Sequence, residues 1–371
     1  MLASSENVIV ASMNYRLGVY GFLYLNNPKV PGNLALNDQL LAVEWYKEKY
    51  LNFFGGLANN VCLFGESAGA ETLNSLIQSK KRNLFNRAIF QSGEFDISRK
   101  SPPEVYENSI IYLRKTRCVP YNFPLTSPIT QAIIDCLLKT DPKRLISVQN
   151  GHFWYPTSSF IENNIIINHD VLIGFTQNEA TTFLNDRFNP KYISSSEQLL
   201  NNDPEDETKY DNNFVVNRLK DYFQHLPKTY LKCISDLYTF TNNIFLNDNY
   251  QGTVNYNLDN DVNSKLNSRS LAWKKISKIS SDMTYDCAGI DFKNQLKTTG
   301  KKLMFNFNKR PNIRGFSSNP LWFGCTHADE LAYIFGIPFL YSTKYNINDN
   351  ERLQSSLMMS YWANFAKSGV L

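Results

Sequence analysis

The chain has 371 residues, of which 43% are hydrophobic and 14% aromatic, so it is long enough to bury a sizeable core. Its formal net charge is only +4 and its basic residues are dispersed, which argues against a nucleic-acid partner. No apolar run approaches the ~18 residues of a membrane-spanning helix, so no transmembrane segment is predicted in this chain. Because single α/β domains are often this large, we expect one domain over residues 1–371.

Strands and helices are predicted to alternate along the chain. The continuous apolar, β-branched run 8–14 predicts a buried strand, and a helix is expected over 38–50. Leu41, Val43 and Trp45 are among the apolar positions of that helix. Further strands are predicted at 61–64, 87–91, 171–174 and 302–307, and a further helix at 70–79. This alternation is typical of a doubly wound, mostly parallel sheet, so the predicted fold class is α/β.

Two stretches interrupt the alternation and are predicted to be helical or irregular insertions. The first covers about 94–168. The second covers about 185–300, is rich in Asn and Asp, and includes the acidic run 202–207, for which we expect an exposed loop. The second insertion is predicted to be either a cap over the functional site or a surface elaboration.

The pentapeptide Gly65-Glu66-Ser67-Ala68-Gly69 lies at the junction between a predicted strand and a predicted helix. Such a Gly-x-Ser-x-Gly sequence also occurs in ordinary loops, but a strand before it and a helix after it are typical of a nucleophile elbow. The tight turn leaves little room for Cβ atoms beside the serine, which explains the flanking glycines. Ser67 is therefore the candidate nucleophile, and the Ala68 N–H is the candidate oxyanion-hole donor.

Further motifs, upstream and downstream of the pentapeptide, carry a specific resemblance. Upstream they read Asn14-Tyr15-Arg16-Leu17-Gly18, Gly21-Phe22-Leu23, Pro31-Gly32-Asn33, Asp38-Gln39, Trp45 and Phe54-Gly55-Gly56. Downstream they lie within 84–93, 174–179, 327–338 and 361–367. Over nearly its whole length the chain resembles the type-B carboxylesterase and cholinesterase family of α/β-hydrolases. It departs from the family at Leu57-Ala58, where relatives usually have Asp-Pro.

The resemblance implies an α/β-hydrolase fold, a small-molecule ester substrate, and no cofactor or metal. Family chains begin before the counterpart of Met1, with early strands and a His-Gly-Gly loop, and they continue beyond the counterpart of Leu371. We therefore expect a fragment with its N-terminal strands missing. A secreted or ER-lumenal location is implied by the family, with any signal peptide upstream, although no Asn-x-Ser/Thr sequon occurs in the chain.

The six cysteines do not have the spacing of a zinc site, because no close Cys pair meets a His pair. Family members often close a disulfide in the region of Cys118 and Cys136, so the resemblance implies a bridge between these two. Cys287 resembles a family cysteine whose partner lies beyond the end of this chain.

Acyl transfer by a serine needs a base that can take its proton near neutral pH. The chain has four histidines. His327 lies in a segment that resembles the catalytic-histidine loop of the family, so the resemblance implies that it is the base. His169, which directly precedes the predicted strand at 171–174, is the alternative. His152 lies in a predicted loop and His225 in a polar helical stretch, and neither is favoured.

The orienting acid is predicted to be Glu179, because its segment resembles the one that supplies the triad glutamate of the family. The order Ser, Glu, His is that of α/β-hydrolases. Asn178 and Ala180 depart from the usual Asp-Glu-Gly, although neither removes the carboxylate. Asp329 is the alternative acid, but it is so close in sequence to His327 that it would have difficulty reaching the distal ring nitrogen.

Two other features follow from the resemblance. Glu66 matches a family glutamate, and the resemblance implies a supporting electrostatic role for it. Arg16 and Asp38 resemble a buried structural ion pair.

Two classes of function are compatible with this sequence. The first is a serine hydrolase that cleaves carboxylic esters through an acyl-enzyme, with Ser67 as nucleophile, His327 as base and Glu179 as orienting acid. The second is a non-catalytic adhesion or interaction module on the same fold, as in neuroligin-like relatives, or an inactive fragment that lacks the full oxyanion hole. Adhesion relatives generally lack the nucleophile, so the intact Ser67, Glu179 and His327 favour the hydrolase.

Overall fold

The computed structural model describes residues 1–50, 53–93, 100–149, 154–162, 166–183, 211–224, 226–237, 268–311, 324–341 and 347–371. The chain divides into two compact units. The first unit comprises 1–174, 288–305 and 356–371, and the second comprises 175–287 and 306–355. His152, His225 and the acidic run 202–207 lie outside the described residues. The prediction that the whole chain is one domain stays a prediction.

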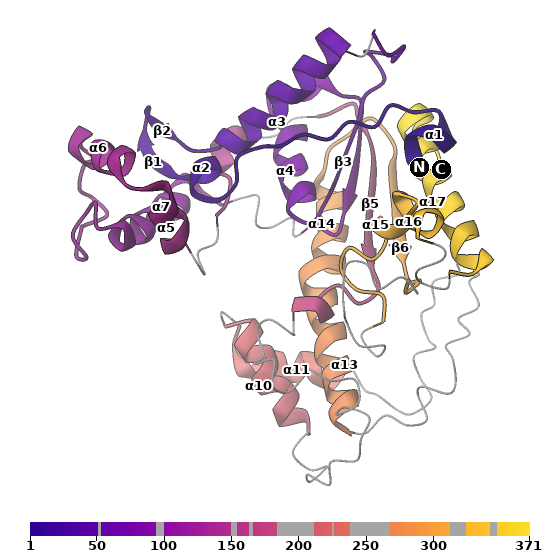
Figure 1. The fold of residues 1–371 in the computed structure, drawn as a ribbon. Helices are drawn as coiled ribbons and strands as arrows, with labels where there is room; N and C mark the ends of the chain where they lie inside the picture. The colour runs from indigo at the N-terminus through magenta and orange to yellow at the C-terminus, as the bar shows by residue number, and fades with distance from the viewer. Residues whose placement is uncertain are drawn as a thin grey trace. The chain divides into compact units, whose positions relative to one another are not determined.

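A four-stranded sheet organises the first unit (Figure 1). Its strands are β3 (Cys62–Glu66), β4 (Arg87–Gln91), β5 (Asp170–Thr176) and β6 (Lys302–Phe307), and they lie side by side in that order. The β3–β4 and β4–β5 pairs are parallel. Hydrogen bonds also join β5 to β6. Val171 N donates to Lys301 O near the start of both strands, and Gln177 N donates to Phe307 O near the end of both. The four strands predicted here are confirmed, with ends that shift by at most two residues.

The central strands are buried because helices cover both faces of the sheet, which is the usual situation of a parallel sheet. Consecutive strand residues point to opposite faces. On β4, the ring of Phe90 lies 5.2 Å from that of Phe292 on α14 (Cys287–Gln295). The next residue, Gln91, accepts a hydrogen bond from Trp362 Nε1 on α17 (Asp349–Ser368). Helices α14 and α17 therefore pack on opposite faces of the sheet.

The helices predicted beside the sheet are confirmed, with small changes at their ends. The helix predicted at 70–79 is α4 (Ala68–Ile77). The helix predicted at 38–50 is α3 (Leu34–Trp45), which continues as a π-helix over Tyr46–Tyr50. Of the three apolar positions singled out in this helix, Val43 is buried, whereas Leu41 and Trp45 are exposed.

The strand predicted at 8–14 is wrong. This segment lies between two short helices, α1 (Leu2–Glu6) and α2 (Gly18–Phe22), and it pairs with no strand among the described residues. Ile9 and Val10 are exposed at 47% and 39%. A β-branched run suits a strand, but only hydrogen bonds to a neighbouring strand make it one.

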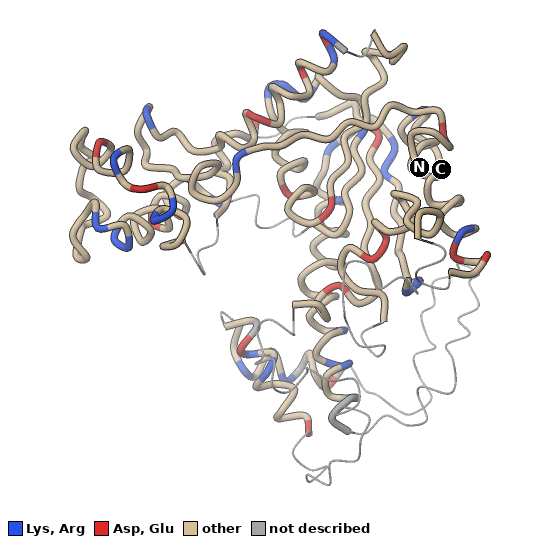
Figure 2. The backbone as a smooth tube through the Cα atoms, in the orientation of Figure 1, with Lys and Arg blue, Asp and Glu red and all other residues tan. Residues whose placement is uncertain are grey.

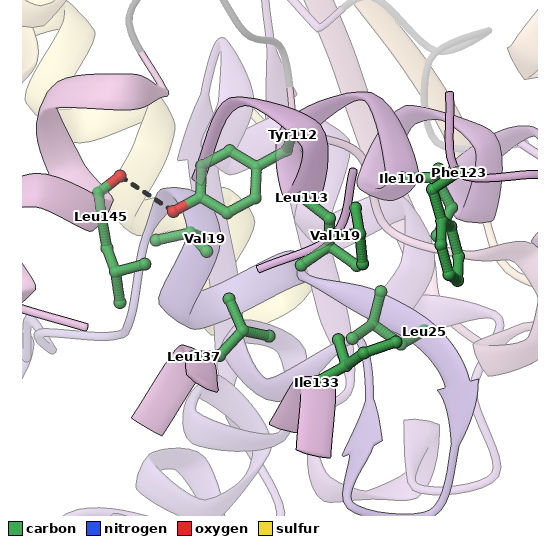
Figure 3. Close-up of a cluster of buried hydrophobic side chains, with 10 residues drawn as sticks. All are labelled: Val19, Leu25, Ile110, Tyr112, Leu113, Val119, Phe123, Ile133, Leu137 and Leu145. Carbon is green, nitrogen blue, oxygen red and sulfur yellow. Dashed lines mark hydrogen bonds between the residues drawn. The ribbon is translucent and has the colours of Figure 1, made fainter. Parts of the chain in front are cut away.

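The first insertion folds as a helical cluster in the first unit. It contains α5 (Pro102–Thr116), α6 (Gln131–Lys139), α7 (Pro142–Val148) and the 3₁₀ turn η4 (Ser158–Phe160). Helices α5, α6 and α7 pack with α2 and a small hairpin, β1 (Tyr24–Asn27) and β2 (Val30–Pro31). Figure 3 shows their shared core, in which the Tyr112 hydroxyl donates to the Leu145 carbonyl at 2.9 Å. The predicted Cys118–Cys136 disulfide is confirmed, with its Cα atoms 5.6 Å apart.

The second unit contains α10 (Asn212–Tyr222), α11 (Lys228–Leu237), α13 (Ser268–Ser281), the π-helix η7 (Asp282–Asp286), α15 (Leu331–Ile334) and α16 (Ile337–Leu340). Helices α10, α11 and α13 enclose an apolar core of their own, in which Leu219, Leu231 and Ile276 are fully buried. No helix in the described part of the chain is long and apolar enough to cross a membrane. Basic and acidic residues are interspersed along the backbone of both units (Figure 2).

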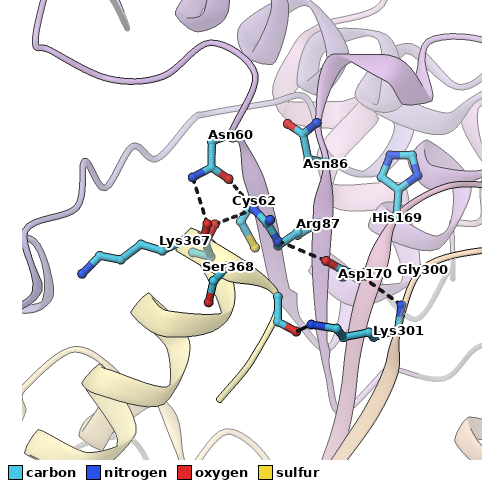
Figure 4. A network of polar contacts seen from close by, with 12 residues as sticks. Asn60, Cys62, Asn86, Arg87, His169, Asp170, Gly300, Lys301, Lys367 and Ser368 are labelled. Carbon is cyan, nitrogen blue, oxygen red and sulfur yellow. Dashed lines mark hydrogen bonds and ion pairs between the residues drawn. The ribbon is translucent and has the colours of Figure 1, made fainter.

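A polar network at the amino ends of the strands holds the end of α17 (Figure 4). Arg87, the first residue of β4, pairs with Asp170, the first residue of β5, at 3.3 Å, and also donates to the Ala366 carbonyl at 3.0 Å. Asn60 and Lys301 donate to the carbonyls of Lys367 and Gly369. These donors satisfy carbonyl groups that the last turn of a helix leaves without intrahelical partners.

Candidate active site

Ser67 lies on a strained turn between β3, which ends at Glu66, and α4, which begins at Ala68. Its backbone has φ 55° and ψ −125°, a conformation that residues other than glycine rarely adopt. A hydrogen bond from Ser67 N to Gln91 O at 2.8 Å holds the turn against β4. The predicted sequence of strand, sharp turn and helix is therefore confirmed.

The two glycines beside Ser67 differ in what the turn requires of them. A Cβ atom at Gly65 would lie 2.5 Å from the carbonyl carbon and oxygen of Gly69, so only glycine fits at position 65. A Cβ atom at Gly69 would meet no described atom within 4 Å. The prediction that lack of room explains both glycines is wrong for Gly69, because its missing side chain would point into open space.

The amino end of α4 presents backbone donors next to Ser67. Ser67 O accepts hydrogen bonds from Ala70 N and Glu71 N, which closes the first helical turn. Ala68 N–H, at the first helical position, has no acceptor within the helix, and the helix dipole places partial positive charge there. Ala68 is exposed. Its N–H can therefore donate to an anion, and its role in an oxyanion hole stays a prediction.

The structure brings Glu179 and His327 together within the second unit. His327 Nδ1 lies 2.6 Å from Glu179 Oε2, and Glu179 Oε1 accepts a hydrogen bond from Thr176 N at 2.5 Å. Glu179 follows the carboxyl end of β5, and Asn178 N donates to Cys325 O, which ties its turn to the histidine loop. The Glu179 side chain is fully buried and that of His327 is 9% exposed.

Aromatic rings fix the plane of the imidazole. The ring of Phe183 lies 4.9 Å from that of His327 at an interplanar angle of 60°, and the ring of Tyr285 lies 5.5 Å away at 49°. These rings reduce the access of water to the hydrogen bond between Glu179 and His327. Low local dielectric strengthens such a charge-assisted bond.

The alternative acid, Asp329, accepts hydrogen bonds from within its own turn. Its Oδ2 accepts from Thr326 N at 2.6 Å and from Thr326 Oγ1 at 3.1 Å. Burial raises the pKa of this carboxyl, and the hydrogen bonds from Thr326 partly oppose that rise. Asp329 therefore helps to shape the histidine loop, while Glu179 is the acid that contacts the imidazole.

The alternative base, His169, lies at the other end of β5. It is buried, with its Nε2 3.0 Å from Arg82 O and its ring 4.9 Å from that of Phe85. Burial lowers the pKa of this imidazole. His169 precedes the seven residues of β5 and Glu179 follows them, so the two residues lie at opposite ends of the strand.

Ser67 belongs to the first unit, whereas Glu179 and His327 belong to the second. The hydrogen-bonding distance predicted between Ser67 and His327 therefore stays a prediction. The supporting electrostatic role of Glu66, which is half-buried, also stays a prediction.

The ion pair between Arg16 and Asp38 is present, with Arg16 Nη2 2.6 Å from Asp38 Oδ1. The hydrogen bonds from Arg16 lower the pKa of the Asp38 carboxyl. The prediction that the pair is buried is wrong, because the side chains of Arg16 and Asp38 are 48% and 23% exposed.

Sequence reasoning missed the residues of α13 and η7 that contact the histidine or the turn that carries Glu179. Ser277, Ser281 and Tyr285 are spaced four residues apart and contact Thr181, Ala180 and His327. The four-residue spacing was available in the sequence as a signal, since such residues share one face of a helix.

A parallel sheet with a serine on a strained strand-to-helix turn, followed along the chain by a hydrogen-bonded glutamate and histidine, defines an α/β-hydrolase. The family comparison agrees: the model of the carboxylesterase family matches residues 1–370. The chain belongs to the carboxylesterase family.

Known relatives of the chain include cholinesterases. It is 29% identical to acetylcholinesterase 1 of Caenorhabditis elegans and 28% identical to that of Caenorhabditis briggsae, over 100% of this chain and 58% of each relative. It is 26% identical to a cholinesterase of Mus musculus, over 99% of this chain and 57% of that relative. The chain thus spans less than two thirds of the length of these relatives.

Proposed function

We propose that this chain carries the catalytic residues of a serine hydrolase that cleaves carboxylic esters through an acyl-enzyme intermediate. The observation that carries the proposal is the 2.6 Å hydrogen bond between His327 Nδ1 and the buried carboxylate of Glu179. Family membership and the strained backbone of Ser67 support it.

The proposed chemistry assigns one task to each residue. Glu179 keeps the proton of the neutral imidazole on Nδ1, so Nε2 is the nitrogen that takes the proton of the Ser67 hydroxyl as its oxygen attacks the ester carbonyl. The imidazolium then gives that proton to the departing alcohol, which leaves an acyl group on Ser67. Water repeats the sequence and releases the carboxylic acid.

Ala68 N–H is the proposed donor to the oxyanion that forms at the ester carbonyl. A single donor of this kind typically contributes about 10² to 10³ in turnover, or roughly 2.7 to 4 kcal/mol. The relatives named above are cholinesterases by name. For this chain we propose carboxylic esters as the substrate class.

A fluorophosphonate probe tests the proposal, because it forms a covalent bond with an activated serine and does not require turnover. We expect mass spectrometry of the labelled 371-residue chain to place the probe on Ser67. Labelling should be absent in Ser67→Ala and about 10² to 10⁴-fold slower in His327→Gln, because general-base assistance typically contributes that much.

Folded variants with the near-UV circular dichroism of the wild type are needed for this comparison. If a folded wild-type chain leaves Ser67 unlabelled, or if His327→Gln labels as fast as the wild type, the hydrolase proposal is wrong. The non-catalytic alternative would then be favoured.

A further inference from the structure

The histidine loop, residues 324–330, leads directly into the short helix α15, where Tyr333 N donates to Glu330 O at 3.0 Å. Ala328, the residue next to His327, has φ 69°, a left-handed conformation that residues other than glycine rarely adopt. Such a conformation costs free energy and persists only where the surrounding structure holds it. The loop therefore depends on its attachments on the two sides of the histidine.

The attachment before the histidine is to the turn of Glu179 and to β6. Cys325 O accepts a hydrogen bond from Asn178 N at 2.8 Å. The Cys325 side chain is buried, and its Sγ lies 3.3 Å from the carbonyl oxygen of Phe307, the last residue of β6. This side of the loop is thus joined to the segment that carries the orienting acid.

The attachment after the histidine is through Tyr333, which is fully buried. Its hydroxyl donates to Glu351 Oε2 at 2.6 Å, and its carbonyl oxygen accepts from Ser355 Oγ at 2.7 Å. Glu351 and Ser355 are four residues apart on α17, so they share one face of that helix, and both belong to the second unit. The side chain and the main chain of Tyr333 are therefore held by the same helix face.

Glu351 is a fully buried acceptor with a positively charged neighbour. Lys309 Nζ lies 3.1 Å from Glu351 Oε1, and Glu351 N donates to the side chain of Asn348 at 3.0 Å. Burial and the hydrogen bond to Glu351 both raise the pKa of Tyr333, so its hydroxyl keeps the proton that it donates. A hydrogen bond to an ionised acceptor is about twice as strong as one between neutral groups, so this attachment is firm.

A simpler alternative is that the contact between Tyr333 and Glu351 contributes stability alone and has no effect on the histidine. Two observations favour a role at the site. The strained Ala328 lies between the histidine and Tyr333 in the same short segment. The two attachments also meet at Phe307, because its ring lies 5.4 Å from that of Tyr333 and its carbonyl oxygen lies beside Cys325 Sγ.

We propose that Tyr333 is a positioning residue for His327. Its hydrogen bond to Glu351 holds the histidine loop in the conformation in which Nδ1 of the imidazole reaches Glu179. The inference rests on the proposed function, in which the imidazole takes the proton of Ser67. Tyr333 acts through the loop and does not touch the substrate. Displacing a catalytic group by about 1 Å can lower a rate by about 10²-fold, which sets the size of the expected effect.

Tyr333→Phe tests the proposal, because it removes the hydroxyl and keeps the ring. We expect a fluorophosphonate to label Ser67 about 10²-fold more slowly in this variant than in the wild type. The matched control is Tyr112→Phe, because Tyr112 is equally buried and its hydroxyl donates to Leu145 O at 2.9 Å in the helical cluster of the first unit. This control also loses a buried hydrogen bond but should leave labelling unchanged. If Tyr333→Phe labels no more slowly than Tyr112→Phe, the proposal is overturned.

Proton NMR of the full chain provides a measurement that does not require a reactive serine. The Nδ1 proton of His327, hydrogen-bonded to Glu179, should give a downfield resonance that is absent in His327→Gln. Tyr333→Phe should shift or broaden this resonance, whereas Tyr112→Phe should leave it in place. An unchanged resonance in Tyr333→Phe would overturn the proposal. Failure of the hydrolase proposal is separately visible, because Ser67 would then stay unlabelled in the wild type while the resonance still responds to Tyr333→Phe.

Two variants of Glu351 test the same hydrogen bond from its other side, and they do not depend on Tyr333→Phe folding. In Glu351→Gln the side-chain carbonyl can still accept from the Tyr333 hydroxyl, so labelling should slow by less than about tenfold. Glu351→Leu removes the acceptor and should slow labelling by about 10²-fold. Near-UV circular dichroism like that of the wild type identifies the folded variants. If folded Glu351→Leu labels as fast as Glu351→Gln, the hydrogen bond does not position the histidine and the proposal is overturned.

Discussion

Replacing Glu179 with glutamine tests the central interaction of the site with almost no change in shape. In the wild type, Glu179 Oε1 accepts from Thr176 N and Oε2 lies 2.6 Å from His327 Nδ1. Glutamine can keep the first contact through its carbonyl oxygen, so its amide nitrogen then faces Nδ1. An amide donates a proton, so Nδ1 must accept, and the neutral imidazole carries its proton on Nε2.

This tautomer cannot take a proton from Ser67 through Nε2. The corresponding carboxylate-to-amide change in a serine protease lowers turnover by about 10⁴, or roughly 5.5 kcal/mol in the activation free energy. We expect a loss of similar size in the rate at which a fluorophosphonate labels Ser67 in Glu179→Gln. The ¹⁵N shifts of His327 should also show the proton on Nε2.

Asp329→Asn is the matched control, because Asp329 is the other carboxylate that the sequence offered as the orienting acid. Its oxygen contacts Thr326 and not the imidazole, and asparagine can still accept those hydrogen bonds. Labelling should therefore slow by less than about tenfold, the equivalent of one weakened hydrogen bond. If Glu179→Gln labels as fast as the wild type, or if Asp329→Asn loses as much, the assignment of the orienting acid is wrong.

Three further predictions concern stability and the serine turn. Removing the Cys118–Cys136 bridge in a double alanine variant should lower the free energy of unfolding by about 3 kcal/mol in denaturant titrations, because it closes a loop of 18 residues. Burial lowers the pKa of His169, so the folded state binds a proton on this imidazole only at a lower pH than the unfolded state does. The free energy of unfolding should therefore fall as the pH drops below ~6.5, and His169→Asn should flatten that part of the profile of Tm against pH. Gly65→Ala should abolish labelling of Ser67, since its Cβ meets the Gly69 carbonyl at 2.5 Å, whereas Gly69→Ala should be tolerated; equal effects of the two would contradict the geometry.

The strands of the sheet could be predicted because their signal is local. The run 87–91 is a strand with the predicted bounds, and 302–307 is as well. The run 8–14 carried the same kind of signal and failed, because a strand also needs a neighbour, and no local pattern states whether one is present. The hairpin of β1 and β2 was missed because its strands, only four and two residues long, are too short to give a clear pattern.

The site was predictable where a short motif fixes a local conformation or matches a family segment. The strained turn at Ser67 and the loop of His327 are of this kind. Tyr285 was not found, because its contact with His327 exists only after α13 and η7 pack against the turn of Glu179. The exposure of Arg16 could not be inferred either, since a motif specifies a partner but not the surface on which the pair lies.

The acidic residues around His327 in the second unit bear on its proposed role as a base, in which it becomes positively charged. Glu179 and Glu330 are fully buried, and Asp329 is 9% exposed in the same histidine loop. The nearby thiol of Cys325 responds to this environment: burial raises its pKa, and Asp329, Glu330 and Glu179 raise it further. Surroundings that disfavour a thiolate favour an imidazolium, because both effects follow from the same negative potential. In the proposed mechanism, these carboxylates would favour the positive charge that His327 carries once it has taken the serine proton, although the chain as a whole has a net charge of +4.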